Sequence, residues 1–381
     1  MRTDITILLF VLVLLLSGFQ YLDAQPSDAA TIEGRVLSLP DREPLQGVHV
    51  FLSGSKIGTV TDSTGSYKLY DIPPGAHRLT YSTIGYERLT EDILVEPRLT
   101  FFIDRTLRPH VYEMDEIVIQ GVGAQQSRDL DFFLRLFVGE SVHSHHVEIL
   151  NPEVLRFDRR WWGVFTAHAD APIRIVNHAL GYKITYYLNE FRYRNKITRW
   201  KGEPHFEEME PESAQQLAEW KENRKAAFYG SQRHFLLTLI NNRLSEEGYE
   251  LYRQNSMESG RLQSSRERIV GRQLVNEHEK LPVYRLNYYG WLEINYTREY
   301  EDLNYVRTVK SGDAGVRNIQ QSFMQLRQRP ITIDKDGIIL EPYGATLHGY
   351  FGFHRIADKT PREYRPENFS VQNSVSDTFN P

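Results

Sequence analysis

Three histidines and one glutamate lie close together in the chain and could bind a metal ion. The stretch consists of His143, Ser144, His145, His146, Val147 and Glu148. On a β-strand, His143 and His145 would lie on one face, because successive side chains alternate. Two neutral imidazoles and a carboxylate such as Glu148 are suitable ligands for a divalent metal ion. The stretch predicts either such a site or a polar strand with ordinary surface histidines.

Tryptophan side chains suggest a second chemistry, the stacking of sugar rings. Trp161 and Trp162 are adjacent, and Trp291 lies in a later aromatic stretch. Exposed aromatic faces can bind glycans, whereas aromatic residues at alternate strand positions more often pack in a core. These three tryptophans are therefore candidate ligand-binding residues, with core packing as the alternative.

The sequence lacks the motifs of several common enzyme classes. It has no cysteines, which excludes disulfides, thiolate zinc sites and cysteine nucleophiles. Neither HExxH nor GxSxG occurs, and the SxxK pattern of Ser53 and Lys56 lies in a turn without its companion motifs. We expect no catalytic residues and no cofactor, apart from the divalent metal considered above.

Composition indicates an ordinary globular protein. A length of 381 residues suits two domains. The formal charge of -5 gives no broad attraction to nucleic acid, so we expect no nucleic-acid partner. Aromatic residues make up 12% of the chain, which favours β structure.

The first residues have the pattern of a secretory leader. Arg2 precedes an apolar run from Ile5 to Leu16, and Ala24 is a small residue suited to cleavage. The run is shorter than the ~20 residues that a spanning helix needs. We predict a signal peptide at residues 1–24 and no transmembrane segment after its removal; a retained anchor is the alternative. Such a protein would be periplasmic, associated with the outer membrane, or secreted.

Residues 30–108 read as a β-sandwich. Short alternating stretches recur about every ten residues, separated by turn signals. The stretch GTVTDSTGSYKLYDIPPGAHRLTYSTIGY begins at Gly58 and contains three of these turn signals, at residues 62–65, at residues 73–75 and at Gly85. Asp62 can bond back to the main chain, and Gly65 can adopt a positive φ.

Together with IEGRV and EPLQGVHVFL, this stretch resembles the carboxypeptidase-like regulatory domain. The resemblance implies a transthyretin-like (Ig-like) sandwich of cell-envelope proteins in Bacteroidetes-type bacteria, with a structural or adhesive role. It does not imply peptidase activity. His145 and Glu148 do spell the H-x-x-E of metallocarboxypeptidases, but those enzymes need a large mixed α/β domain, so we reject that interpretation.

Residues 109–127 are predicted to be a connecting strand and linker. Within them, residues 113–121 resemble the segment that follows this domain in TonB-dependent outer-membrane receptors. There the segment leads into a plug and a large barrel, and the roughly 260 residues that follow here are too few for one.

Residues 128–360 are predicted to be an α+β domain. Helical spacing occurs at residues 128–138, in a helix after Pro211 and in a helix capped by Ser231, whereas alternation predicts antiparallel strands and a hairpin at 331–340. Several stretches are similar to the C-terminal half of uncharacterised proteins with the same regulatory domain, which brings no catalytic residues. Residues 361–381 are expected to form a loosely ordered tail.

Taken together, these patterns predict a non-catalytic cell-envelope protein that acts by binding or structural support. The sandwich would brace a partner-binding C-terminal domain, and the partner would be an envelope protein or a glycan. The alternatives are a metal-dependent hydrolase using His143 and His145, and a glycan-binding module.

Overall fold

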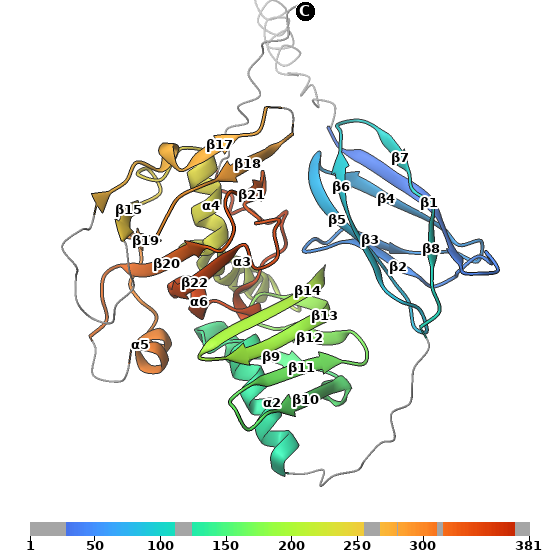
Figure 1. The fold of residues 1–381 in the computed structure, drawn as a ribbon, viewed down its shortest axis with the longest axis horizontal. Coiled ribbons are helices and arrows are strands. Elements are labelled where there is room, and N and C mark those ends of the chain that lie inside the picture. Colours follow the sequence, from blue (N-terminus) through green and yellow to red (C-terminus); the bar gives the residue numbers. More distant parts are fainter. Residues whose placement is uncertain (1–27, 111–123, 255–266, 280, 311–314, 370–381) are drawn as a thin grey trace, which may run out of the picture.

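The protein is described by a computed structural model over residues 28–110, 124–254, 267–279, 281–310 and 315–369 (Figure 1). Strands dominate and form several mostly antiparallel sheets, with helices packed against two of them. The mainly β, α+β architecture predicted from the sequence is therefore confirmed. The predicted leader, residues 111–123 of the linker and residues 370–381 of the tail lie outside the described residues. Within the described ranges, no helix is long and apolar enough to cross a membrane.

Residues 30–107 form a β-sandwich, drawn in blue in Figure 1. One sheet has the order β4-β1-β7, with β8 also pairing with β1, and the other has the order β3-β2-β5-β6. The strands are β1 (Ala30–Ser38), β2 (His49–Leu52), β3 (Gly58–Val60), β4 (Ser66–Ile72), β5 (Gly75–Ser82), β6 (Leu89–Val95), β7 (Thr100–Phe102) and β8 (Arg105–Leu107).

The turn residues of the sandwich stabilise the conformation of the main chain. Asp62 Oδ1 accepts hydrogen bonds from the amides of Thr64 and Ser66 at 2.8 and 2.9 Å. Gly65 has φ +72°, and a Cβ there would lie 2.5 Å from the Val36 carbonyl oxygen. No other residue fits such a position without strain. The two sheets are joined through their core by the hydroxyls of Tyr67 and Tyr81, 3.0 Å apart.

A six-stranded sheet follows, with one long helix packed on it. Its order is β10-β11-β13-β12-β9, and β14 pairs with the other edge of β13. Phe133 and Phe137 of the helix are fully buried against the strands. The elements are α2 (Ala124–Phe137), the 3₁₀ helices η1 (Val142–His146) and η2 (Pro152–Val154), and the strands β9 (Val147–Ile149), β10 (Leu155–Arg159), β11 (Phe165–Ala169), β12 (Ile173–Asn177), β13 (Tyr182–Arg194) and β14 (Ile197–Glu208).

Two helices, α3 (Ala214–Phe228) and α4 (Gln232–Ile240), connect this sheet to the last part of the chain. The hydroxyl of Ser231 accepts a hydrogen bond from the His234 amide at 3.1 Å, so the predicted cap is confirmed. The helical spacing of Ala214, Leu217, Trp220 and Ala227 predicts an inward stripe on α3. Trp220 packs inward, but Leu217 is 37% exposed. The predicted stripe is therefore too wide. The buried face of α3 is narrower than the distribution of its apolar residues suggests.

The last part of the chain contains two smaller sheets, of orders β16-β15-β19-β20-β22 and β17-β18-β21. Helix α4 supplies Phe235, Leu236 and Leu239 to their common core. The elements are β15 (Tyr249–Gln254), β16 (Glu267–Arg268), η3 (Gly271–Gln273), β17 (Val275–Glu277), β18 (Val283–Leu286), β19 (Trp291–Tyr296), α5 (Leu303–Val309), β20 (Gln320–Leu326), β21 (Ile331–Asp334), β22 (Ala345–Gly349), α6 (Tyr350–Phe353) and η4 (Ile356–Asp358).

Residues 360–365, which we call the closing segment, lie where these parts meet. Arg362 Nη2 is 2.7 Å from Asp334 Oδ2 in the predicted hairpin at 331–340, and it donates to the Ala76 carbonyl of the sandwich at 3.1 Å. Arg233 of α4 donates to the carbonyls of Pro361 and Tyr364 at 3.0 and 2.9 Å. The expectation of a loosely ordered tail is thereby corrected for residues 361–364, whose carbonyls accept hydrogen bonds from the distant Arg233.

Candidate functional site

The predicted metal ligands do not form a site in the structure. Residues 142–146 form the 3₁₀ helix η1 rather than a strand, so His143 and His145 do not share a face. His143 is buried, whereas His145 and Glu148 are exposed, and Glu148 lies 4.0 Å from His178. Across the described ranges, no three His, Asp or Glu side chains are grouped so that they could hold a metal ion. The strand prediction was wrong because η1 has only five residues, too few for the three-residue period of a 3₁₀ helix to be recognised in the sequence.

His143 instead belongs to a buried hydrogen-bonded cluster. Its Nδ1 lies 2.8 Å from Asp358 Oδ1 in η4, and Ser141 Oγ donates to the same oxygen at 2.9 Å. Burial, the largest single effect, would raise the pKa of Asp358. The hydrogen bonds from His143 and Ser141 and the nearby His354 together outweigh it and keep the pKa below its ordinary value. Serine, histidine and aspartate are thus all present, but the serine contacts the aspartate rather than the imidazole. A nucleophilic triad needs the imidazole between the serine and the aspartate, so this cluster is not a triad. Its hydrogen bonds instead join η1 to η4.

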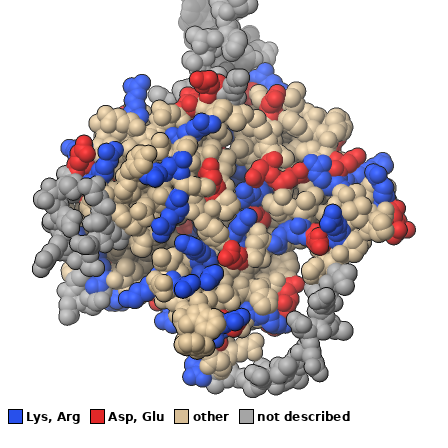
Figure 2. All heavy atoms as spheres, in the orientation of Figure 1, with Lys and Arg blue, Asp and Glu red and all other residues tan. Residues whose placement is uncertain are grey.

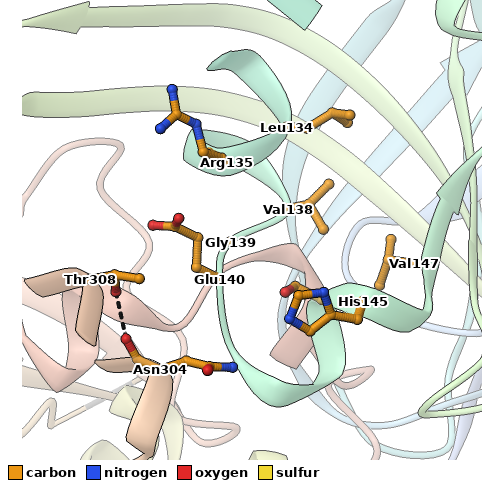
Figure 3. Close-up of a pocket in the computed structure, with 10 residues that line it drawn as sticks. Leu134, Arg135, Val138, Gly139, Glu140, His145, Val147, Asn304 and Thr308 are labelled. Atoms are coloured by element: carbon orange, nitrogen blue, oxygen red, sulfur yellow. Dashed lines mark hydrogen bonds between the residues drawn. The ribbon is translucent and has the colours of Figure 1, made fainter. Parts of the chain in front are cut away.

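A shallow cavity of about 390 Å³ lies beside this cluster, between α2, η1 and α5 (Figure 3). Its apolar wall comes from Leu134, Val138 and Val147, and its polar groups are Arg135, Glu140, Ser144, His145, Asn304 and Thr308. In Figure 3 the Arg135 and Glu140 side chains lie on one side of the cavity and His145 on the other. Gly139 forms the turn beneath, with φ +104°. A Cβ at this glycine would lie 2.9 Å from Arg355 Cβ.

The cavity contains opposite charges but no activated nucleophile among its described residues. Ser144 Oγ donates to the Ser141 carbonyl at 2.7 Å, which turns its proton away from His145. Thr308 Oγ1 likewise donates to the Asn304 carbonyl at 2.8 Å, as the dashed line in Figure 3 shows. Such a cavity can bind a small polar molecule through Arg135 and Glu140. Its lining residues come from two distant segments, 134–147 and 304–308. Because no local pattern joins them, only His145 was identified from the sequence.

The three candidate tryptophans lie in two different places. Trp161 and Trp162 form the turn between β10 and β11, 92% and 52% exposed, with their rings nearly perpendicular at 5.4 Å. Trp291 lies on β19 of another sheet and is half-buried against His348, with ring centroids 5.3 Å apart. The core-packing alternative therefore does not describe Trp161 and Trp162. The three side chains do not make one aromatic surface.

The sandwich contacts the rest of the protein through a junction that sequence patterns did not reveal. Phe51 of β2 stacks on Tyr187 at 5.0 Å and on His205 at 5.3 Å. The Gly54 amide donates to the Pro204 carbonyl at 2.6 Å, and Phe206 donates to the Ser55 carbonyl at 3.0 Å. These bonds join the β2–β3 connection to strand β14.

Polar side chains complete this junction. Ser53 donates to Glu203 Oε2, and Arg78 lies 3.7 Å from Glu203 Oε1. At Gly58 the approach is so close that a Cβ would lie 2.5 Å from the His205 ring. No local pattern could have identified this junction, because its partners are about 150 residues apart.

Two histidines where the sandwich meets the rest of the protein are held neutral by their surroundings. Burial and the nearby Arg362 lower the pKa of His77 to about 4, and burial lowers the pKa of His205 to about 4. His77 Nε2 lies 2.6 Å from the Pro73 carbonyl oxygen, so the neutral ring donates there. The junction therefore contains imidazoles that acid would charge.

Comparisons with known proteins identify the first domain. Residues 32–119 match the family model of the CarboxypepD_reg-like domain. A TonB-dependent receptor, P39, of Formosa agariphila is 39% identical over 125 residues, which cover 32% of this chain and 11% of that protein. The chain thus spans about a ninth of the length of that relative. The regulatory-domain resemblance predicted from the turn and strand motifs is confirmed.

Solved structures give weaker likenesses. The minor pilin GBS52 of Streptococcus agalactiae has a TM-score of 0.21 at 13% identity, covering 23% of this chain and 48% of that one. The 5-hydroxyisourate hydrolase of Klebsiella pneumoniae has a TM-score of 0.19 at 19% identity, covering 22% of this chain and 92% of that one. Such scores are too low to assign a fold, and the sandwich follows from its own strands.

The two histidines of the predicted metal site should behave differently when they are replaced. His143→Ala leaves the buried Asp358 carboxylate without its imidazole, so we expect the free energy of unfolding to fall by about 2–4 kcal/mol. His145→Ala removes an exposed side chain and should change it by less than about 0.5 kcal/mol. Urea unfolding followed by tryptophan fluorescence measures both. Equal effects of the two variants would contradict the role of His143 as the buried partner of Asp358.

Acid should weaken the folded state through His77. Its folded pKa of about 4 lies below the unfolded value of 6.5, so the unfolded chain binds more protons between those values. The stability is complete above about pH 6.5 and is lost as the pH falls towards 4. In the variant His77→Gln, which keeps a donor for Pro73, the loss between about pH 7 and pH 5 should be smaller by about 2 kcal/mol. Denaturant unfolding at a series of pH values measures this, and an unchanged slope would disprove it.

Proposed function

We propose that this chain is an exported, non-catalytic protein of the cell envelope. In this proposal the sandwich is fixed on the larger α+β part so that the two present one rigid binding surface. The CarboxypepD_reg-like domain supports a non-catalytic role. The similarity to a TonB-dependent receptor supports a place at the envelope.

The junction between the sandwich and strand β14 is the observation that carries the proposal. A domain joined only by a linker would bury few side chains against its neighbour. Here Phe51 is 2% exposed and stacks on two rings of the other domain. Glu203, also 2% exposed, accepts a hydrogen bond from Ser53 across the same junction. Buried aromatic and charged contacts of this kind support one fixed arrangement rather than two independent domains.

The chemistry of the polar clusters favours binding over catalysis. Ser141 and His143 both direct their hydrogen bonds to Asp358. The hydroxyl protons of Ser144 and Thr308 at the cavity are directed to main-chain carbonyls. A hydroxyl nucleophile needs a base within hydrogen-bond reach. The cavity is then a place to hold a small polar group, and the partner is an envelope protein or a glycan.

Rigid docking can be tested by spin labelling, because the chain has no cysteines to interfere. Labels at Ile84→Cys on the sandwich and Tyr300→Cys on the larger part replace side chains that are 90% and 72% exposed. We expect a narrow distance distribution by pulsed electron resonance, and a broad one when Phe51→Ala is added, because that change removes about 3–5 kcal/mol of packing. Phe102→Ala, 77% exposed on the sandwich, is the matched control. A broad distribution before any change would refute fixed docking.

Export can be tested by fractionating cells that express the chain with a C-terminal epitope. We expect the epitope in the periplasmic or outer-membrane fraction, on a product shortened by about the length of residues 1–24. Deletion of residues 5–16 should keep it in the cytoplasm, because the leader then lacks its apolar run. Full-length chain in the cytosol, with the leader intact, would count against the envelope assignment.

A further inference from the structure

Two turns project from the same end of the six-stranded sheet. In the β10–β11 hairpin the last pair is Arg159 with Phe165, and Phe165 in turn pairs with Tyr193 near the end of β13. The β13–β14 hairpin closes at Arg194 with Ile197. The Trp161-Trp162 turn and the Asn195-Lys196 turn are therefore neighbours. We call these two turns and the adjacent outer-face arginines the sheet tip.

The aromatic part of the sheet tip is exposed on a hydrogen-bonded turn. The Arg160 amide donates to the Val164 carbonyl at 2.8 Å, and the Gly163 amide donates to the Arg160 carbonyl at 3.0 Å. These two bonds close a tight turn. Gly163 has φ +81°. Folding gains nothing from placing Trp161 in water at 92% exposure. Two adjacent exposed tryptophans on a hydrogen-bonded turn point to a partner that covers them.

The basic part of the sheet tip consists of four exposed side chains, Arg192, Arg194, Lys196 and Arg199. Among the described residues, none of the four forms an ion pair or a side-chain hydrogen bond. Arg192 and Arg199 are direct cross-strand neighbours, an arrangement of like charges that destabilises a sheet. Figure 2 shows Lys and Arg side chains grouped over the lower middle of the drawn face, with fewer Asp and Glu beside them. The charges therefore suit an external anion.

The geometry of the two indoles favours a lipid surface over a sugar. A flat platform for several sugar rings would need the two indoles in one plane, but the two rings stand at 84° to each other. The guanidinium of Arg160 also lies 5.6 Å from the centre of the Trp162 ring. Perpendicular rings at a projecting tip are suited to insertion among headgroups, where indoles are enriched, while arginine and lysine behind them contact phosphates.

We propose that the sheet tip docks the protein on a membrane surface that contains anionic phospholipids. Trp161 and Trp162 would insert at the headgroup level, and Arg192, Arg194, Lys196 and Arg199 would contact lipid phosphates. Docking of this kind depends on both apolar area and charge, so it is sensitive to lipid composition and to salt. It requires neither export nor a fixed sandwich, so this proposal and the proposed function can fail separately.

The test is flotation of the purified protein with vesicles of phosphatidylethanolamine and phosphatidylglycerol. We expect binding at low salt, weaker binding at high salt, and none to vesicles of phosphatidylcholine alone. The double change Arg192→Gln and Arg199→Gln should weaken binding about 10-fold or more. Trp161→Ser with Trp162→Ser should also weaken it strongly and remove the blue shift of tryptophan emission on binding.

Matched controls separate the sheet tip from general surface effects. Lys221→Gln with Lys225→Gln removes the same charge from α3, and Tyr289→Ser removes another exposed aromatic ring that lies 3.9 Å from an arginine. Both should bind as the unchanged protein does, and near-ultraviolet circular dichroism verifies that each variant is folded. Absence of binding to anionic vesicles, equal binding to neutral ones, or equal losses in the controls would overturn the proposal. Binding to a soluble anionic glycan without flotation would do the same.

Discussion

The buried ion pair between Arg362 and Asp334 is the contact on which the arrangement of the chain depends. Arg362 is 7% exposed and Asp334 is fully buried. Burial alone would lower the pKa of Arg362, but Asp334 and Asp336 outweigh it and keep the pKa above its ordinary value. A buried charge is tolerated only where partners satisfy it, and removal of one partner leaves the other uncompensated. Because Arg362 also donates to the Ala76 carbonyl, the hairpin, the closing segment and the sandwich have to meet in one geometry.

The same arginine affects how the junction responds to acid. Its positive charge lowers the pKa of His77, second only to burial. The guanidinium that joins the sandwich to the closing segment thus also disfavours a second positive charge beside it. His205, stacked on Phe51, is kept neutral by burial on the other side of the junction. Both pKa shifts have one main physical cause, the exclusion of water where the sandwich meets the rest of the protein, and at His77 the charge of Arg362 adds to it.

Sequence patterns were informative where the determining interactions are local. Asp62 contacts amides two and four residues away, and Ser231 caps its own helix, so the sandwich turns and the start of α4 could be predicted. His143 was misplaced because its partner Asp358 is 215 residues away. Residues 361–364 look polar and irregular, yet Arg233 of α4 donates to their carbonyls and Arg362 pairs with the distant Asp334. The cavity and the junction could not be predicted either, since both are assembled from distant segments.

Arginine has two distinct roles in this protein, and the contrast bears on where a partner binds. Arg233 and Arg362 direct their nitrogens to carbonyl and carboxylate oxygens, which accounts for their positions. Arg192 and Arg199 repel each other across two strands, and stability of the chain does not explain them. Tryptophan shows the same contrast: Trp220 is 3% exposed and donates to the His178 carbonyl at 2.8 Å, whereas Trp161 is 92% exposed. The mutually repelling arginines and the exposed tryptophan lie at the same end of one sheet. Their occurrence together is stronger evidence for an external partner than either feature alone.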